Sequence, residues 1–238
     1  MFNDEEQQNI LEVFEKLNKE DIQYIVPRKY EELPKKSLGE DIDIIVNKKD
    51  FNESISVLNQ IGFEDYERKL NYSLILKGLR NPLKAIKVVF TNPQASKNLL
   101  GAYEKNIETK KLVKGDIILD LKNKLAYKST SIDHRIPADP QLEKFLFDNS
   151  RRHKEVIKVP SIEDELTHIV AHCIFDKDGN FEEYYQERVK YLLKDADRDK
   201  VRSRLEKIFF KAEKFVYKKM RQDELSKLRK NLVQYSDY

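Results

Sequence analysis

The stretch from Gly39 to Val46, which reads Gly-Glu-Asp-Ile-Asp-Ile-Ile-Val, constrains this chain more than any other. Two carboxylates two positions apart open a run of β-branched residues, and such a run is typical of a strand. Side chains at i and i+2 of a strand project from one face, so we expect Asp41 and Asp43 to point together. Adjacent acids repel each other and lose solvation unless a cation neutralises them. The pair therefore indicates either a metal site, with Mg²⁺ the usual ion beside phosphates, or a solvated strand end.

Periodicity and cap residues predict the elements around this stretch. Helices are expected at 4–18, 48–61, 94–107, 161–173 and 181–194, with a long helix from about 200 to 220. Strands are expected at 23–26, in the acidic stretch, and at 72–76, 86–90 and 116–121, with a turn at 78–82. Asn3 and Ser161 are the expected N-caps, and Gly62 the stop of the second helix. A polar loop is expected at 28–39 and an irregular link at 134–140.

One further acid lies inside an apolar strand. Asp120 interrupts Ile117-Ile118-Leu119 and Leu121, where an unpaired carboxylate is costly. It is therefore the natural third ligand for a cation held by Asp41 and Asp43. Asp116 shares its face by parity but lies at the mouth of the strand, where water reaches it.

The order of these elements resembles the nucleotidyltransferase superfamily typified by DNA polymerase β, and within it the minimal, uncharacterised bacterial and archaeal branch. The segments that carry the resemblance are 28–34, 40–46, 118–121 and 166–177. The resemblance implies an α+β fold, in which a nucleotidyltransferase-like mixed sheet is flanked by helices and followed by a C-terminal helical domain. It implies an α/β domain at 1–157 and a helical domain at 158–238.

The resemblance also implies an activity. A nucleoside monophosphate group would move from an NTP to a hydroxyl-bearing acceptor, and pyrophosphate would leave. Asp41 and Asp43 would bind two Mg²⁺ ions, and Asp120 would complete the metal site and act as the base. Two cations that bridge a triphosphate stabilise charge on both the attacking and the leaving oxygen. The acceptor, whether a small molecule, a protein or an RNA end, stays open. Replacing Asp41 or Asp43 by Asn is expected to abolish transfer and to leave the fold intact.

The chain departs from the superfamily before the acidic stretch. Where the family has a Gly-Gly or Gly-Ser pair for close approach to phosphates, this chain reads Val26-Pro27-Arg28-Lys29. Arg28 and Lys29 are able to hold phosphates by charge instead, and Gly39 is the third nucleotide-binding candidate. The missing pair also leaves open a second interpretation, a catalytically inactive binding or regulatory module such as a toxin–antitoxin partner.

Other residues have two interpretations each. His168 and His172 lie at i and i+4 of a predicted helix and are able to share a metal, but packed, hydrogen-bonded histidines are favoured because no third ligand accompanies them. His172 is also a candidate for lining a cleft between the two units. Cys173 is expected to be a buried apolar residue rather than a nucleophile. The basic cluster at 151–154 is expected to be a surface linker rather than a phosphate contact.

Charge is spread unevenly along the chain. Residues 1–70 carry 17 acidic and 10 basic side chains, whereas residues 194–230 carry 14 basic and 7 acidic ones. A basic end is typical of a nucleic-acid partner or of a solvated helix face, and in so Lys-rich a chain the second is favoured.

Composition limits the compartment. The single cysteine excludes an internal disulfide framework, and no apolar stretch approaches the length of a membrane span. The acidic start lacks the basic end and apolar run of a signal peptide. We expect a cytoplasmic protein without a membrane partner.

Overall fold

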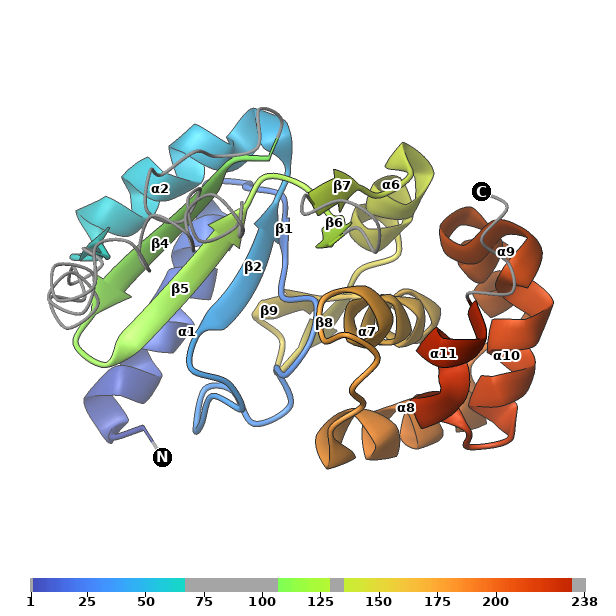
Figure 1. The fold of residues 1–238 in the computed structure, drawn as a ribbon. Coiled ribbons are helices and arrows are strands. Elements are labelled where there is room, and N and C mark those ends of the chain that lie inside the picture. The colour runs from blue at the N-terminus through green and yellow to red at the C-terminus, as the bar shows by residue number, and fades with distance from the viewer. Residues whose placement is uncertain (1, 67–106, 129–134, 233–238) are drawn as a thin grey trace, which may run out of the picture.

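The computed structural model describes residues 2–66, 107–128 and 135–232. The strands expected at 72–76 and 86–90, the turn at 78–82 and nearly all of the helix at 94–107 lie outside the described residues. What is described confirms the α+β class, because a mixed sheet with flanking helices is followed by a helical C-terminal part (Figure 1).

The described sheet has five strands in the order β1-β2-β5-β4-β3. Its strands are β1 (Tyr24–Ile25), β2 (Ile42–Val46), β3 (Glu64–Asp65), β4 (Thr109–Lys114) and β5 (Ile117–Lys122). The central neighbours β2 and β5 run parallel, and the other pairs are antiparallel. Helices α1 (Asp4–Lys19) and α2 (Phe51–Gln60), the latter preceded by the 3₁₀ turn η1 (Lys48–Asp50), cover one face of this sheet (Figure 1).

Local signals account for these two helices. The Asn3 side chain accepts from the backbone N–H of Glu6, and the Glu6 side chain accepts from that of Asn3, so the first helix has a full capping box. Its apolar stripe is fully buried: Ile10, Val13, Phe14 and Leu17. Burying each such side chain contributes about 1.5–3 kcal/mol as an upper estimate. Gly62, with a φ of +87°, follows the second helix as expected.

Strand β4 was not expected from the sequence. Three of its six residues are lysines, and only Leu112 is buried, so the segment shows no apolar alternation. It forms a hairpin with β5 across a turn that holds Gly115 at a φ of +60°. Pairing to a neighbour, rather than burial of its own side chains, makes this segment a strand.

The C-terminal part begins with small hairpins and continues as helices. The hairpins are β6 (Ala126–Lys128) with β7 (Arg135–Pro137) and β8 (Arg151–His153) with β9 (Ile157–Val159), separated by α6 (Pro140–Asp148). The helices are α7 (Ile162–Phe175), α8 (Glu183–Asp195), α9 (Arg198–Phe209), α10 (Glu213–Arg221) and α11 (Leu228–Leu232), with 3₁₀ turns η2 (Phe210–Ala212) and η3 (Leu225–Lys227).

Three expectations for this part were wrong in whole or in part. The link at 134–140 contains β7, and Pro140 opens α6 at a position where its missing N–H costs nothing. The linker expected at 151–154 lies mostly at the surface, as expected, but most of it is strand β8, paired with β9. The single helix from about 200 is two helices, α9 and α10, that break at Phe210, whose φ is +47°.

Helix α7 is the centre of the helical part. Every residue from Asp164 to Ile174 is buried, and Ser161 caps the helix by accepting from the N–H of Asp164, as expected. Ile25 and Ile45 of the sheet belong to the same apolar cluster as α7. Ile157 and Val159 of β9 belong instead to a second cluster, which the sheet forms with helices α1 and α2. The expected boundary between 157 and 158 falls inside β9, and the division into two domains stays a prediction. Among the described helices, none combines the length and the apolar character needed to cross a bilayer.

Candidate active site

A row of charged side chains crosses the face of the sheet that α1 and α2 leave open. Asp43 of β2 is paired with Asp120 of β5 in the parallel register, and Asp120 is paired with Lys111 of β4 in the antiparallel register. Paired residues of neighbouring strands project from the same face, and Ile42 and Ile44 project from the other, where they are buried. The structure therefore brings two of the three expected acids side by side.

Both acids contact one lysine. The Lys122 Nζ lies 2.6 Å from Asp43 Oδ1 and 3.0 Å from Asp120 Oδ2. The other oxygen of Asp43, Oδ2, accepts from Arg28 Nη2 at 2.5 Å. Burial alone would raise the pKa of Asp43, but Lys122 and Arg28 outweigh it and hold that pKa well below its usual value of 3.8. Asp43 is therefore an ionised carboxylate with both oxygens bonded.

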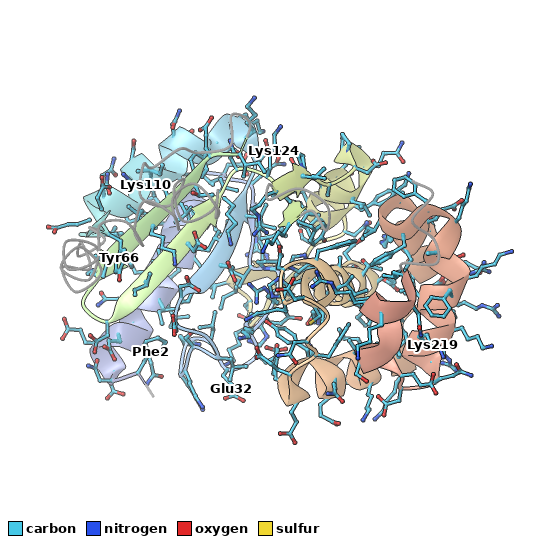
Figure 2. All side chains as sticks on the ribbon, viewed as in Figure 1. Phe2, Glu32, Tyr66, Lys110, Lys124 and Lys219 are labelled. Carbon is cyan, nitrogen blue, oxygen red and sulfur yellow. The ribbon has the colours of Figure 1, made fainter. Side chains whose placement is uncertain are left out.

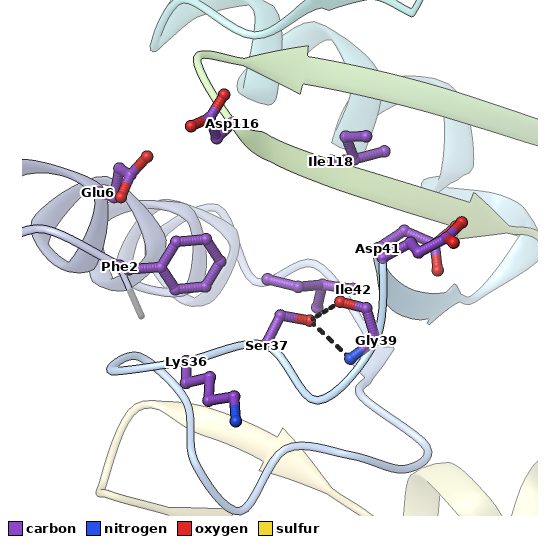
Figure 3. Close-up of a pocket in the computed structure, with 10 residues that line it drawn as sticks. Phe2, Glu6, Lys36, Ser37, Gly39, Asp41, Ile42, Asp116 and Ile118 are labelled. Carbon is purple, nitrogen blue, oxygen red and sulfur yellow. Dashed lines mark hydrogen bonds between the residues drawn. The ribbon is translucent and has the colours of Figure 1, made fainter.

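Asp41 lies one residue before β2 and has a different partner. Its Oδ2 accepts from Lys111 Nζ at 2.5 Å, and the pair is more open to water, with side-chain exposures of 26% and 39%. Asp41 also lines a cavity of about 280 Å³, with Gly39 and Asp116 among the other lining residues (Figure 3). Asp116 is exposed, as expected of an acid at the mouth of the strand. Three acids and three cations thus form one charge-balanced group, which we call the acid–base row: Asp41, Asp43, Asp120, Lys111, Lys122 and Arg28.

Gly39 lies where the chain turns toward β2. Its N–H donates to Ser37 Oγ at 3.2 Å, and Ser37 Oγ donates back to the Gly39 carbonyl at 2.9 Å (Figure 3). A Cβ at Gly39 would lie 3.2 Å from the carbonyl oxygen of Asp41, so a larger residue would press on the backbone that positions this acid. The N–H of Gly39 is bonded within the loop in this structure.

Arg28 and Lys29 both contact helix α8. Arg28 Nη1 donates to the hydroxyl of Tyr185 at 2.6 Å, so one guanidinium joins Asp43 to the helical part. Lys29 has a φ of +58°, the left-handed conformation that glycine adopts most easily, and its ammonium lies 5.8 and 5.4 Å from the ring centres of Tyr184 and Tyr185. A residue with a Cβ thus adopts here the left-handed backbone that glycine favours.

A buried cluster that the sequence did not reveal holds this loop in place. Tyr30 follows Lys29, and its hydroxyl donates to Glu165 of α7, which is fully buried. Arg188 Nε donates to Glu165 Oε1 at 2.6 Å, and Arg151 Nη2 donates to the Tyr30 hydroxyl at 2.5 Å. These hydrogen bonds attach the 28–39 loop, which contains Arg28, to helices α7 and α8 and to strand β8. Arg151, a basic residue of the expected surface linker, is 43% exposed and still bonds to this cluster.

The two histidines of α7 are packed and hydrogen-bonded, as favoured from the sequence. His168 Nδ1 lies 3.1 Å from the Tyr127 hydroxyl, and His172 Nδ1 lies 2.9 Å from Asp176 Oδ2. Burial lowers the pKa of both histidines below 6.5, that of His168 the more strongly. Cys173 is buried, and burial raises the pKa of its thiol to about 12, so it is no nucleophile.

Two carboxylates of the acid–base row form a candidate donor pair for a metal ion. Among the described residues, no group of three or more His, Cys, Asp or Glu side chains is arranged to hold a metal as it stands. Asp43 and Asp120 nevertheless converge on one positive charge, the ammonium of Lys122. Carboxylate oxygens are the ligands that Mg²⁺ prefers, so the chemistry of this acid pair fits that ion.

Comparison with known proteins gives one similarity. No family model matches the chain, and no curated protein matches it significantly. Among solved structures, the chain is similar to the solution structure of the antibiotic-resistance factor ANT(2'')-Ia, with 10% sequence identity and a TM-score of 0.46. The similarity covers 93% of this chain and 99% of that chain, and it is a likeness of overall fold.

Proposed function

We propose that this chain is a Mg²⁺-dependent nucleotidyltransferase, which moves a nucleoside monophosphate from an NTP to a hydroxyl-bearing acceptor. The observation that carries the proposal is the convergence of Asp43 and Asp120 on one cation, on the face of two parallel strands that α1 and α2 do not cover. A basic side chain, Arg28, adjoins the pair and supplies the positive charge that a triphosphate needs.

Each side chain has a role in this proposal. Asp43 and Asp120, with Asp41 beside them, would hold Mg²⁺, which when bound neutralises charge on the triphosphate and on the leaving group. Asp120 accepts the proton of the acceptor hydroxyl. The acceptor oxygen then bonds to the α-phosphorus, the bond from that phosphorus to the bridging oxygen breaks, and pyrophosphate leaves. Arg28 and Lys29 bind phosphate oxygens, and Gly39, which has no side chain, leaves room for the backbone that positions Asp41 beside the nucleotide.

Transfer of label tests the proposal. The purified protein is incubated with each of the four NTPs, labelled at the α-phosphate, together with Mg²⁺ and a cell extract. We expect one or more labelled acceptors, and none with the Asp41→Asn variant. If calorimetry detects no binding of any NTP at millimolar concentration with Mg²⁺, the proposal is wrong.

A second candidate is a binding or regulatory module on the same fold. The observation that favours it is the charge balance of the acid–base row, in which each acid already has a cationic partner. This candidate predicts that no acceptor is labelled under any metal condition, even where an NTP binds.

The basic C-terminal helices remain a nucleic-acid candidate. Nitrogen-tipped side chains project from the outer surface of these helices (Figure 2). Several of the basic residues are bonded to acids within the protein: Arg202 to Glu213, Arg204 to Asp164, Lys219 to Glu224 and Arg229 to Asp178. Fewer positive charges are thus available than the sequence count suggests. Binding of RNA or DNA here would weaken steeply with salt, and a flat response would exclude it.

A further inference from the structure

We infer that Lys122 is a resident counter-ion of the Asp43–Asp120 pair, and that a divalent metal binds here by displacing its ammonium. The inference rests on the proposed nucleotidyl-transfer site but concerns how that site takes up a cation.

The register of the sheet creates the need for a resident cation. Parallel pairing places Asp43 and Asp120 on adjacent strands, which lie about 4.8 Å apart in sheets. Their side chains are only 13% and 14% exposed, so water screens their repulsion poorly. Lys122 follows Asp120 by two residues and therefore projects from the same face of the same strand. The strand that brings the second acid also brings its counter-ion.

Metal and lysine compete because they bind the same two carboxylates. The ammonium donates to Asp43 Oδ1 and lies 3.0 Å from Asp120 Oδ2, so a divalent ion held by these two carboxylates would compete with it for their charge. Arg28 contacts Oδ2 of Asp43 instead and does not stand between the acids. Lys122 is a compact charge on a flexible four-carbon stem, so it is able to leave without movement of the backbone.

Titration with Mn²⁺, followed by the electron paramagnetic resonance signal of the free ion, tests the exchange. We compare the wild-type protein with Lys122→Met and with Lys110→Met. The control removes the same charge from the same sheet, but Lys110 (Figure 2) pairs with Asp65 of β3, the last strand of the described sheet. We expect Lys122→Met to bind Mn²⁺ about tenfold more tightly or better, because the metal no longer competes with a bonded ammonium, and Lys110→Met to match the wild type.

Thermal unfolding shows whether the Lys122→Met variant is folded when its metal affinity is measured. Lys122→Met leaves two largely buried carboxylates without their shared partner, so its thermal unfolding is measured with and without millimolar MgCl₂. We expect Mg²⁺ to raise its melting temperature far more than that of the wild type. The double variant Lys122→Met/Asp120→Asn removes one acid with the lysine. It should fold without Mg²⁺ and bind Mn²⁺ no more tightly than the wild type.

The outcomes separate the exchange from the proposed function. Equal Mn²⁺ affinity of the wild type and Lys122→Met would overturn the exchange, whereas label transfer by the wild type would still support the nucleotidyltransferase proposal. Tighter binding by Lys122→Met, together with no label transfer by the wild type, would support the exchange and count against the activity.

Discussion

Asp43 and Asp120 lie opposite each other on the parallel strands β2 and β5, with the Lys122 ammonium 2.6 Å from one carboxylate and 3.0 Å from the other. This relationship changes what mutation of the site should do. Asp43 was expected to be one half of a repelling pair, but its two oxygens are bonded to Lys122 and Arg28. Removing it therefore removes attraction as well as repulsion.

Asp41 is the cleaner acid for testing catalysis. Its contact with Lys111 is partly open to water, and such pairs contribute about 0–1 kcal/mol to stability. We expect Asp41→Asn to lower the rate of NMP transfer by about 10²-fold or more, because a metal ligand is lost, with the free energy of unfolding nearly unchanged. Urea unfolding and a label-transfer assay measure the two effects. The control is Asp65→Asn, which changes an exposed acid in β3, away from the acid–base row.

Asp43 should make the fold sensitive to acid. Its pKa is below 3.8 in the folded protein, so the unfolded chain takes up the proton first as pH falls. The stabilisation from Asp43 is complete above about pH 5 and is lost progressively below pH 4. We expect Asp43→Asn to be less stable at pH 7, by about 3 kcal/mol, and to show a flatter decline of stability between pH 4 and pH 2. The free energy of unfolding is measured by urea titration at each pH across this range. If it falls equally steeply with pH in the variant and the wild type, Asp43 is not the source of the acid sensitivity.

The backbone of Lys29 should favour glycine over alanine at this position. Its φ of +58° costs a residue with a Cβ about 1 kcal/mol relative to glycine. We expect Lys29→Gly to be more stable than Lys29→Ala by about that amount, since both lose the same ammonium contacts with Tyr184 and Tyr185. Lys218, exposed within α10, is the matched control, because there the order of Gly and Ala should reverse. Equal stability of the two Lys29 variants would show that the turn carries no such cost.

His168 should make stability fall on mild acidification. Burial lowers its pKa well below 6.5, so below that pH the unfolded chain binds a proton that the folded protein does not. The free energy of unfolding then decreases by up to about 1.4 kcal/mol per pH unit for this one group. We expect His168→Gln to reduce the slope between pH 6.5 and pH 5. Thermal unfolding over this range measures it, and an unchanged slope would assign the effect to His172 or to other groups.

Tyr30 should link stability to activity. We expect Tyr30→Phe to lower the free energy of unfolding by about 1.5–3 kcal/mol, because the ring stays packed while Glu165 loses a donor and Arg151 an acceptor. The looser loop should also weaken NTP binding, because Arg28 lies two residues earlier. Calorimetry and urea unfolding test both effects, with Tyr66→Phe, whose residue is 40% exposed, as the control. If Tyr30→Phe is destabilised but binds NTP as tightly as the wild type, the buried cluster around Glu165 does not help to position the nucleotide site.

Part of the site was readable from alternation along single strands. The same-face rule placed Asp41 and Asp43 together, and the cost of an unpaired carboxylate in an apolar strand predicted that Asp120 faces a cation. The same-face rule, applied two residues further, would have shown Lys122 beside Asp120. No such rule shows Lys111, because its place opposite Asp120 depends on the register of a hairpin whose first strand has no apolar pattern. Tyr185 and Glu165 were beyond reach for a similar reason, since each is more than 130 residues from its partner in the 28–39 loop.

The sequence by itself determined the capped helices α1 and α7, the stop at Gly62 and the acidic strand, because caps and periodicity act between residues a few positions apart. The α+β class followed from the resemblance that the order of these elements carries. Only the tertiary structure decided that β4 is a strand, that the helix after residue 200 breaks at Phe210, and that Lys29 adopts a glycine-like turn. It also decided which cation neutralises which acid. Those outcomes depend on strand register and on packing between distant segments, where the energy of the contact outweighs the preference of the residue.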